Sequence, residues 1–198
     1  MTTPIATSII AAQACRYMEV APISSFGDGS ELAAAMAEMY PIALRACLEQ
    51  ADWEFASVLV RLPAAVPAAT VATDDEMPNL YTLPGDLVKV REVGDADTIW
   101  RIDREGLRAS DAAPLRVRYT GTIETEARLP AEFQLAVAAK LASLMGPRWL
   151  GAQSKIDALR AEAEDLLKTA MRSSARAASE MRYDGLDDEG DWVAEALR

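Results

Sequence analysis

Residues 40–56 read Tyr40-Pro41-Ile42-Ala43-Leu44-Arg45-Ala46-Cys47-Leu48-Glu49-Gln50-Ala51-Asp52-Trp53-Glu54-Phe55-Ala56, and they decide the fold. Upstream, Ser30 is a suitable N-cap, and apolar residues at three- and four-residue spacings predict a helix over 31–51. Pro41 lies inside this helix and should kink it, since an interior proline costs about 3 kcal/mol. Trp53 and Phe55 follow the helix end, where we expect them to anchor a helix–strand junction in the core.

The elements on either side predict helices around a β-rich middle. We expect a helix over 4–18, a strand over 57–62 and an extended loop over 63–79. Over 86–120, apolar and basic residues alternate with period 2, which predicts a sheet with one apolar and one basic face. Gly94-Asp95 marks a hairpin turn between the first two strands of that region.

Two further helices are expected after the sheet. Pro130 opens the first, whose core residues are Phe133, Val137, Leu141 and Leu144, and Gly146-Pro147 stops it. Ser154 with Asp157 resembles a capping box before a helix of about 28 residues, with a narrow stripe formed by Ile156, Leu159, Ala163, Leu166, Ala170 and Met171. The predicted fold class is therefore α+β, mainly an α-helical bundle with a small antiparallel β-sheet and an extended C-terminal tail. We expect one domain over 1–182, with the sheet inserted at about 57–120, and a flexible acidic tail over 183–198.

Composition narrows the possible functions. The chain has 198 residues and a net charge of −11, which excludes a simple coating of DNA phosphates by clustered cations. Histidine is absent, which excludes His-based triads and most zinc sites. Cys15 and Cys47 lie far apart and are expected to be buried free thiols. We find no signal peptide and no apolar run long enough to span a membrane, so no membrane partner is expected.

The charged face of the predicted sheet leaves three interpretations open. Residues 89–118 hold seven basic and six acidic side chains, for a net of +1 on an acidic chain. This face is a solvated surface, a contact between subunits or, least favoured, a DNA-binding surface. For the subunit contact, the candidate interface residues are Arg91, Arg101, Arg116 and Arg118.

The C-terminal tail carries a candidate binding anchor. Trp192 lies in a polar, glycine-broken segment with no core to enter, and tryptophan is enriched at interface hot spots. A binding segment and a merely disordered end both remain open. Asp187, Glu189 and Asp191 have the alternate spacing of a calcium loop, but Trp192 stands where that loop needs glycine, so no metal site is expected.

Enzyme signatures are weak. Glu124, Glu126 and Glu132 can supply a general acid and a general base, so a carboxylate-dependent hydrolase of the cell envelope stays open as an alternative. No phosphate-binding glycine loop and no nucleophile elbow is present. We therefore expect a protein without enzymatic activity and without a cofactor.

Three blocks, in order, resemble the phage head-to-tail adaptor family, which includes tail tubular protein A and related head-completion ring subunits. The first is the opening stretch, with Tyr40, Pro41, Arg45, Trp53 and Phe55 as its structural motif. The second is Leu80-Tyr81-Thr82-Leu83-Pro84-Gly85-Asp86, a Leu-Pro passage before a strand. The third is Leu115–Tyr119 followed by Leu129-Pro130-Ala131-Glu132-Phe133, a strand that leads to a Leu-Pro helix start. The resemblance covers about 30–180 and leaves 63–79 and the tail unmatched.

The resemblance implies a structural subunit of a homo-oligomeric ring, of about twelve copies, beneath the portal of a tailed phage or phage-like particle. Its partners would be the portal protein and a downstream tail or stopper protein, and DNA would pass through the lumen without specific binding. The protein would be made in the host cytoplasm and reside in the virion neck. A C-terminal segment in such proteins often contacts the portal, which makes Trp192, Val193, Leu197 and Arg198 candidate portal-binding residues. A non-viral protein-interaction module is a further alternative.

Overall fold

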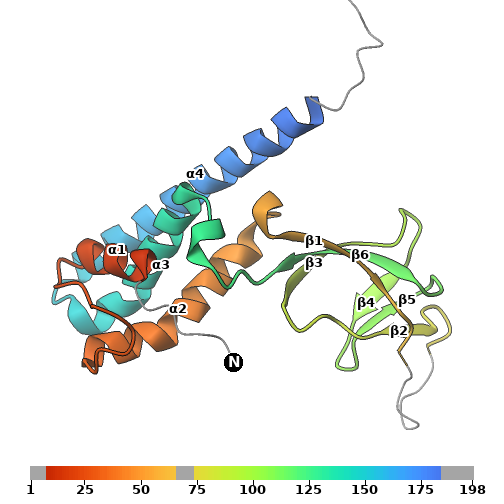
Figure 1. Cartoon of the computed structure of the whole chain (residues 1–198), viewed down its shortest axis with the longest axis horizontal. Helices are drawn as coiled ribbons and strands as arrows, with labels where there is room; N and C mark the ends of the chain where they lie inside the picture. The colour runs from red at the N-terminus through yellow and green to blue at the C-terminus, as the bar shows by residue number, and fades with distance from the viewer. Residues whose placement is uncertain (1–7, 66–73, 184–198) are drawn as a thin grey trace, which may run out of the picture.

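The computed structural model describes residues 8–65 and 74–183, and it confirms the α+β class. Its helices are α1 (Ile9–Tyr17), α2 (Glu31–Gln50), α3 (Ala131–Trp149) and α4 (Gln153–Tyr183), with short 3₁₀ turns at Glu54–Ala56 and Glu126–Arg128. Its strands are β1 (Ser57–Leu62), β2 (Asn79–Tyr81), β3 (Leu87–Val93), β4 (Trp100–Ile102), β5 (Leu107–Ala109) and β6 (Leu115–Gly121). The helices gather at one end of an elongated molecule and the strands at the other (Figure 1).

Side-chain caps start the first two helices. The Ser30 hydroxyl accepts a hydrogen bond from the Ala33 amide at 3.1 Å, which confirms the predicted cap of α2. Ser8 caps α1 in the same way through the Ala11 amide. Pro41 lies inside α2, on its exposed side, and the helix continues through it to Gln50. The predicted kink at Pro41 stays a prediction.

Helix α3 is the centre of the bundle and packs against α1, α2 and α4. Phe133, Val137 and Leu141 are buried as expected, but Leu144 is exposed. The predicted stop at Gly146-Pro147 is wrong, because α3 continues to Trp149. Pro147 lies in the last turn and removes one amide donor there, but the Leu150 amide still donates to the Gly146 carbonyl at 2.8 Å.

Helix α4 is the longest element, and its end projects beyond the bundle (Figure 1). Ile156, Leu159, Ala163 and Ala170 are buried, which confirms most of the predicted stripe, whereas Leu166 and Met171 are only half-buried. The predicted capping box is wrong, because α4 begins at Gln153 and Ser154 lies inside it. The Asp157 carboxylate instead accepts from the side chains of Gln153 and Arg160.

The strands form two three-stranded antiparallel sheets rather than one, in the orders β1-β6-β3 and β2-β5-β4. The hairpin predicted at Gly94-Asp95 is therefore wrong, because β3 pairs with β6 and β4 pairs with β5. Gly94 still turns, at φ 60°, but its amide donates to the Arg116 carbonyl. A second hydrophobic cluster, which includes Tyr81, Leu107 and Val117, lies between the sheets.

The expected alternation holds in β6 and fails in β4. In β6, Leu115, Val117 and Tyr119 are buried, whereas Arg116 is exposed. In β4, Trp100 and Ile102 are exposed together with Arg101, because β4 is a short edge strand beside the fully buried β5. None of the helices in the described ranges is both long and apolar enough to cross a membrane.

Candidate functional site

The three sequence blocks meet where the helical bundle joins the sheets. Trp53 and Phe55 of the first block pack on Phe133 of the third, with ring centroids 4.8 and 4.9 Å apart. Asp86 of the second block accepts a hydrogen bond from the Tyr119 hydroxyl of the third at 2.9 Å. Segments that are distant in sequence are therefore in contact at one junction.

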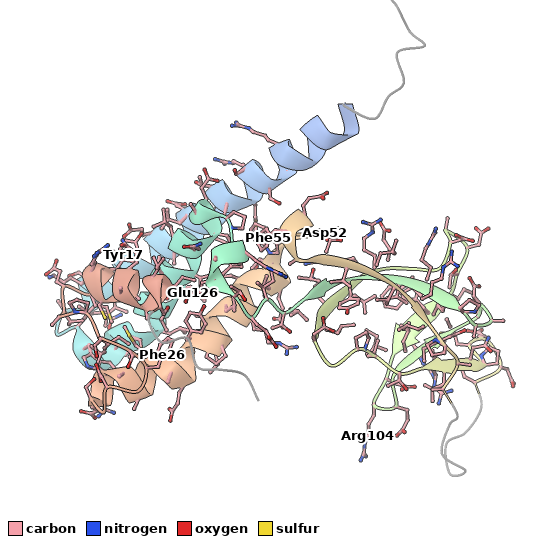
Figure 2. The ribbon with its side chains drawn as sticks, viewed as in Figure 1. Tyr17, Phe26, Asp52, Phe55, Arg104 and Glu126 are labelled. Carbon is pink, nitrogen blue, oxygen red and sulfur yellow. The ribbon has the colours of Figure 1, made fainter. Side chains whose placement is uncertain are left out.

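Trp53 closes the end of α2. Its side chain is fully buried, and its indole nitrogen donates to the Cys47 carbonyl at 3.1 Å. This bond satisfies a carbonyl in the last turn of the helix, which has no partner within the helix itself. Phe55 lies beside it at the junction (Figure 2). Both aromatics are placed as the sequence predicted.

The other motif residues differ in their surroundings. Tyr40 is buried against Phe26, with ring centroids 5.5 Å apart. Burial, and secondly the nearby Glu126 carboxylate, raise the pKa of the Tyr40 hydroxyl above its usual value. Arg45 lies on the exposed face of α2 and pairs with Glu49 at 2.9 Å. These contacts give Tyr40 a packing role and Arg45 a surface position.

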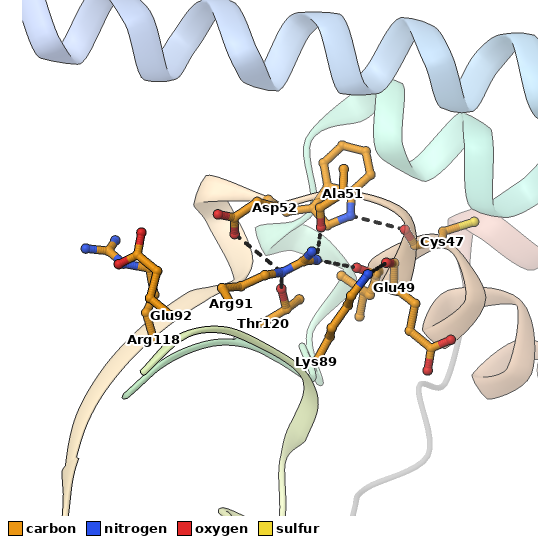
Figure 3. Close-up of polar contacts among 11 residues, drawn as sticks. Cys47, Glu49, Ala51, Asp52, Lys89, Arg91, Glu92, Arg118 and Thr120 are labelled. Carbon is orange, nitrogen blue, oxygen red and sulfur yellow. Dashed lines mark hydrogen bonds and ion pairs between the residues drawn. The ribbon is translucent and has the colours of Figure 1, made fainter. Parts of the chain in front are cut away.

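Arg91, one of the predicted interface residues, connects β3 to the end of α2 (Figure 3). Only 11% of its side chain is exposed. Its guanidinium donates to the Thr120 hydroxyl at 2.8 Å and to the Leu48 carbonyl at 3.3 Å. It also donates to the Ala51 carbonyl and lies 3.6 Å from the Asp52 carboxylate. Arg91 therefore makes these hydrogen bonds within its own chain.

The remaining three candidate arginines lie on the surface of the strands and pair with acids of their own chain. Arg101 pairs with Asp74, Arg116 with Asp95 at 2.9 Å and Arg118 with Glu92 at 3.2 Å. All three side chains are about half-exposed. Exposed pairs of this kind contribute about 0–1 kcal/mol each. They leave these arginines accessible to a partner, and the predicted subunit contact stays a prediction.

An exposed apolar strip on β4 was missed by the sequence analysis. We define it as Ile99, Trp100 and Ile102, whose exposed fractions are 55%, 39% and 48%. Strand β4 is at the edge of its sheet, so its outer backbone groups have no strand partner within the described residues. Leu59 is similarly exposed on β1, the edge strand of the other sheet. The alternation of Trp100, Arg101 and Ile102 indicated a strand, but not that its apolar face would be left uncovered.

The carboxylates considered for a hydrolase lie in different surroundings. Glu126 is buried and accepts from the Ser8 hydroxyl at 2.5 Å and from the Ile9 amide at 3.0 Å, so it caps α1. Glu124 and Glu132 are exposed. In the ranges that the structure describes, no three His, Cys, Asp or Glu side chains are grouped to hold a metal ion. Cys15 and Cys47 are buried free thiols, as predicted.

The candidate portal-binding residues Trp192, Val193, Leu197 and Arg198 lie outside the described residues, as does the predicted flexibility of the acidic tail. No family model matches the chain, and no curated protein matches it. The resemblance to phage adaptors therefore stays a prediction.

Proposed function

We propose that this chain is a structural subunit of a head-to-tail adaptor ring, assembled beneath the portal of a tailed phage or phage-like particle. The observation that carries the proposal is the apolar strip formed by Ile99 and, on edge strand β4, by Trp100 and Ile102. Exposed apolar patches, and edge strands with unpaired backbone groups, are surfaces that other chains bind. The three ordered sequence blocks supply the identity of the assembly.

The position of the strip suits a ring. A contact between different surfaces of identical subunits generates a closed ring when the rotation between neighbours closes. The strip lies on β4 in one sheet, while exposed Leu59 lies on β1 at an edge of the other. One chain thus offers the strip on one sheet and exposed Leu59 on the other, and these are two different surfaces of the kind that a head-to-tail contact joins.

Surface charge is compatible with this assembly. Because Arg101, Arg116 and Arg118 hold weak, exposed pairs, they can exchange them for acids of a neighbouring subunit at little cost. The net charge of −11 repels DNA phosphates, which favours passage through a lumen over tight binding.

The junction supports the role by fixing the strands to the bundle. Arg91 bonds β3 to the end of α2, and the Trp53–Phe55–Phe133 cluster fills the same region. This connection holds the strip of β4 in a fixed orientation relative to the bundle. A non-viral interaction module would use the same strip, and only assembly on a portal separates the two. Glu126 does not favour the hydrolase, since its carboxylate accepts from the α1 cap and otherwise lies near the buried Tyr40 hydroxyl.

The test compares two charge insertions on the full chain. Trp100→Asp with Ile102→Asp places two carboxylates on the strip, whereas Ile42→Asp places one on exposed, isolated Ile42 of α2. We expect the strip variant to keep its far-UV circular dichroism spectrum and to lose ring formation on the portal, as counted in electron micrographs. The Ile42 variant should form rings as the wild type does. Rings of unchanged yield in the strip variant would count against the proposal.

A further inference from the structure

An open groove of about 610 Å³ lies between α2, α3 and α4. Its floor is mainly apolar and includes Cys47, Leu144, Leu167 and Met171. Leu144 of α3 is exposed there, with 38% of its surface accessible. Burial raises the pKa of the Cys47 thiol to about 12, so the floor carries no thiolate near neutral pH. The groove is thus an uncovered apolar surface within the bundle.

The groove is rimmed by positive charge on an acidic protein. Lys140, Arg160 and Lys168 line it, against the single acid Glu164. Arg160 and Lys168 hold only exposed pairs one turn away along α4, at 3.3 and 3.2 Å. Such pairs contribute about 0–1 kcal/mol, so both cations can accept other partners. An occupant with an apolar face and acidic flanks would fit this surface.

Residues 184–198 of the same chain have this chemistry. The segment contains six acids (Asp184, Asp187, Asp188, Glu189, Asp191 and Glu195) and one Arg, for a net charge of −5. At helical spacing, Trp192, Val193, Ala196 and Leu197 share one face. The charge and the apolar face both complement the groove.

The length of the connection permits docking within one chain. From Tyr183 back to Met171 is 12 residues of α4, or about 18 Å, and back to Leu167 is about 24 Å. The eight residues 184–191 span at most about 26–29 Å when extended. Gly185 and Gly190 permit the reversal of direction that this path needs. Trp192 can therefore reach the floor of the groove at Leu167 and Met171.

We propose that residues 184–198 dock into the groove of their own chain, with Trp192 and Leu197 on the apolar floor and the net negative charge of the segment attracted by Lys140, Arg160 and Lys168. The tether of eight residues gives the segment an effective local concentration in the millimolar range, which favours its own groove over that of another molecule. This inference does not depend on the adaptor ring. If the same segment also binds a portal, the portal must displace it from the groove.

The test uses the methyl resonances of methionine in the full-length protein. Met171 lies on the floor, and its signal can be assigned with Met171→Leu. We expect its shift to change when Trp192→Ala and Leu197→Ala remove the anchor, because the indole ring no longer lies beside it. The signal of Met77, buried in the β region, should not move. A Met171 signal unmoved by the anchor variant would overturn the proposal.

Adding a synthetic peptide of residues 184–198 shows whether the groove of the full-length chain is already occupied by its own segment. The peptide should restore the Met171 shift in the anchor variant and leave the wild type unchanged, whose groove is already filled. Arg160→Glu with Lys168→Glu, added to the anchor variant, should weaken peptide binding about tenfold or more, since two attractions become repulsions. The matched charge reversal Arg61→Glu on β1 should change the affinity for the peptide by less than about twofold.

Two results would contradict docking within one chain. A wild-type Met171 shift that grows with protein concentration, together with a dimeric mass, would place the segment on a second copy. Equal peptide binding by the wild type and the anchor variant would mean that the groove is empty in the full chain. No portal is present in these measurements, so their outcome is independent of the proposed ring.

Discussion

Replacing Arg91 by alanine is expected to weaken the connection between the bundle and the sheets. In the wild type the guanidinium reaches the Thr120 hydroxyl, the Leu48 carbonyl and the Ala51 carbonyl, and only 11% of the side chain is exposed. Leu48 and Ala51 lie at the end of α2, where carbonyls lack partners within the helix. Removing the guanidinium leaves these acceptors without their donor.

The expected loss follows from these bonds. A hydrogen bond from a charged group contributes about 1.5–3 kcal/mol, and a cation at a helix C-terminus about 0.3–1 kcal/mol. The three bonds share one guanidinium and do not add. We therefore expect Arg91→Ala to lower the free energy of unfolding by about 3 kcal/mol, out of the 5–15 kcal/mol typical of a domain.

Urea unfolding followed by far-UV circular dichroism measures this loss. Lys89→Ala is the matched control, because the Lys89 ammonium is exposed and donates only to the Glu49 carbonyl, at 3.3 Å. We expect the control to stay within about 0.5 kcal/mol of the wild type. Arg91→Lys should fall between the two, since an ammonium lacks the planar fork of arginine. The reasoning is refuted if Arg91→Ala also unfolds within about 0.5 kcal/mol of the wild type.

Three further substitutions test separate contacts by the same unfolding measurement. Gly106→Ala should destabilise the β region by about 1–3 kcal/mol, because the φ of Gly106 is 144° and an added Cβ would lie 2.4 Å from the Tyr81 carbonyl oxygen. The control Gly151→Ala, which has open space around it, should be nearly neutral. Burial, and secondly its bond to Asp86, raise the pKa of Tyr119 from 10.0 to about 12. The neutral hydroxyl therefore stabilises the fold below pH 10, and this contribution is lost as the pH rises toward 12. In Tyr119→Phe, the free energy of unfolding should fall less steeply over this pH range. Glu126→Gln should cost about 1–2 kcal/mol, because it weakens the cap of α1, while the exposed Glu124→Gln should have little effect.

The helical part of the fold was predictable because its signals are local. Ser30 caps α2, and four of the six predicted stripe residues on α4 are buried, among them Ile156 and Ala170. The errors are Leu144 of α3, which is exposed rather than buried, and two helix ends. Pro147 falls inside the last turn of α3 instead of ending the helix, and α4 starts before the supposed capping box.

The arrangement of the strands was less predictable, because strand pairing is not local. Gly94-Asp95 has the residues of a hairpin turn, but β6 comes from farther along the chain and takes β3 as its partner. Trp100 and Ile102 alternate with Arg101 as a half-buried strand would, yet their edge position leaves them exposed. The role of Arg91 was hidden for the same reason, since its acceptors lie about 40 residues away along the chain.

The candidate sites also differ in whether local sequence or long-range packing creates them. Trp53 and Phe55 could be placed from sequence, because a helix end followed by aromatics predicts a local anchor. The strip on β4 and the groove between α2, α3 and α4 depend on which neighbours fail to cover them. That property belongs to the packed molecule and has no signature in a single stretch of sequence.

The central claim, that this chain forms a ring on a portal, is tested most directly by electron microscopy of the full-length protein mixed with its cognate portal protein. We expect a closed ring of many copies seated on one face of the portal, with an open channel through both. Bare portals beside a chain that stays monomeric at every concentration would contradict it.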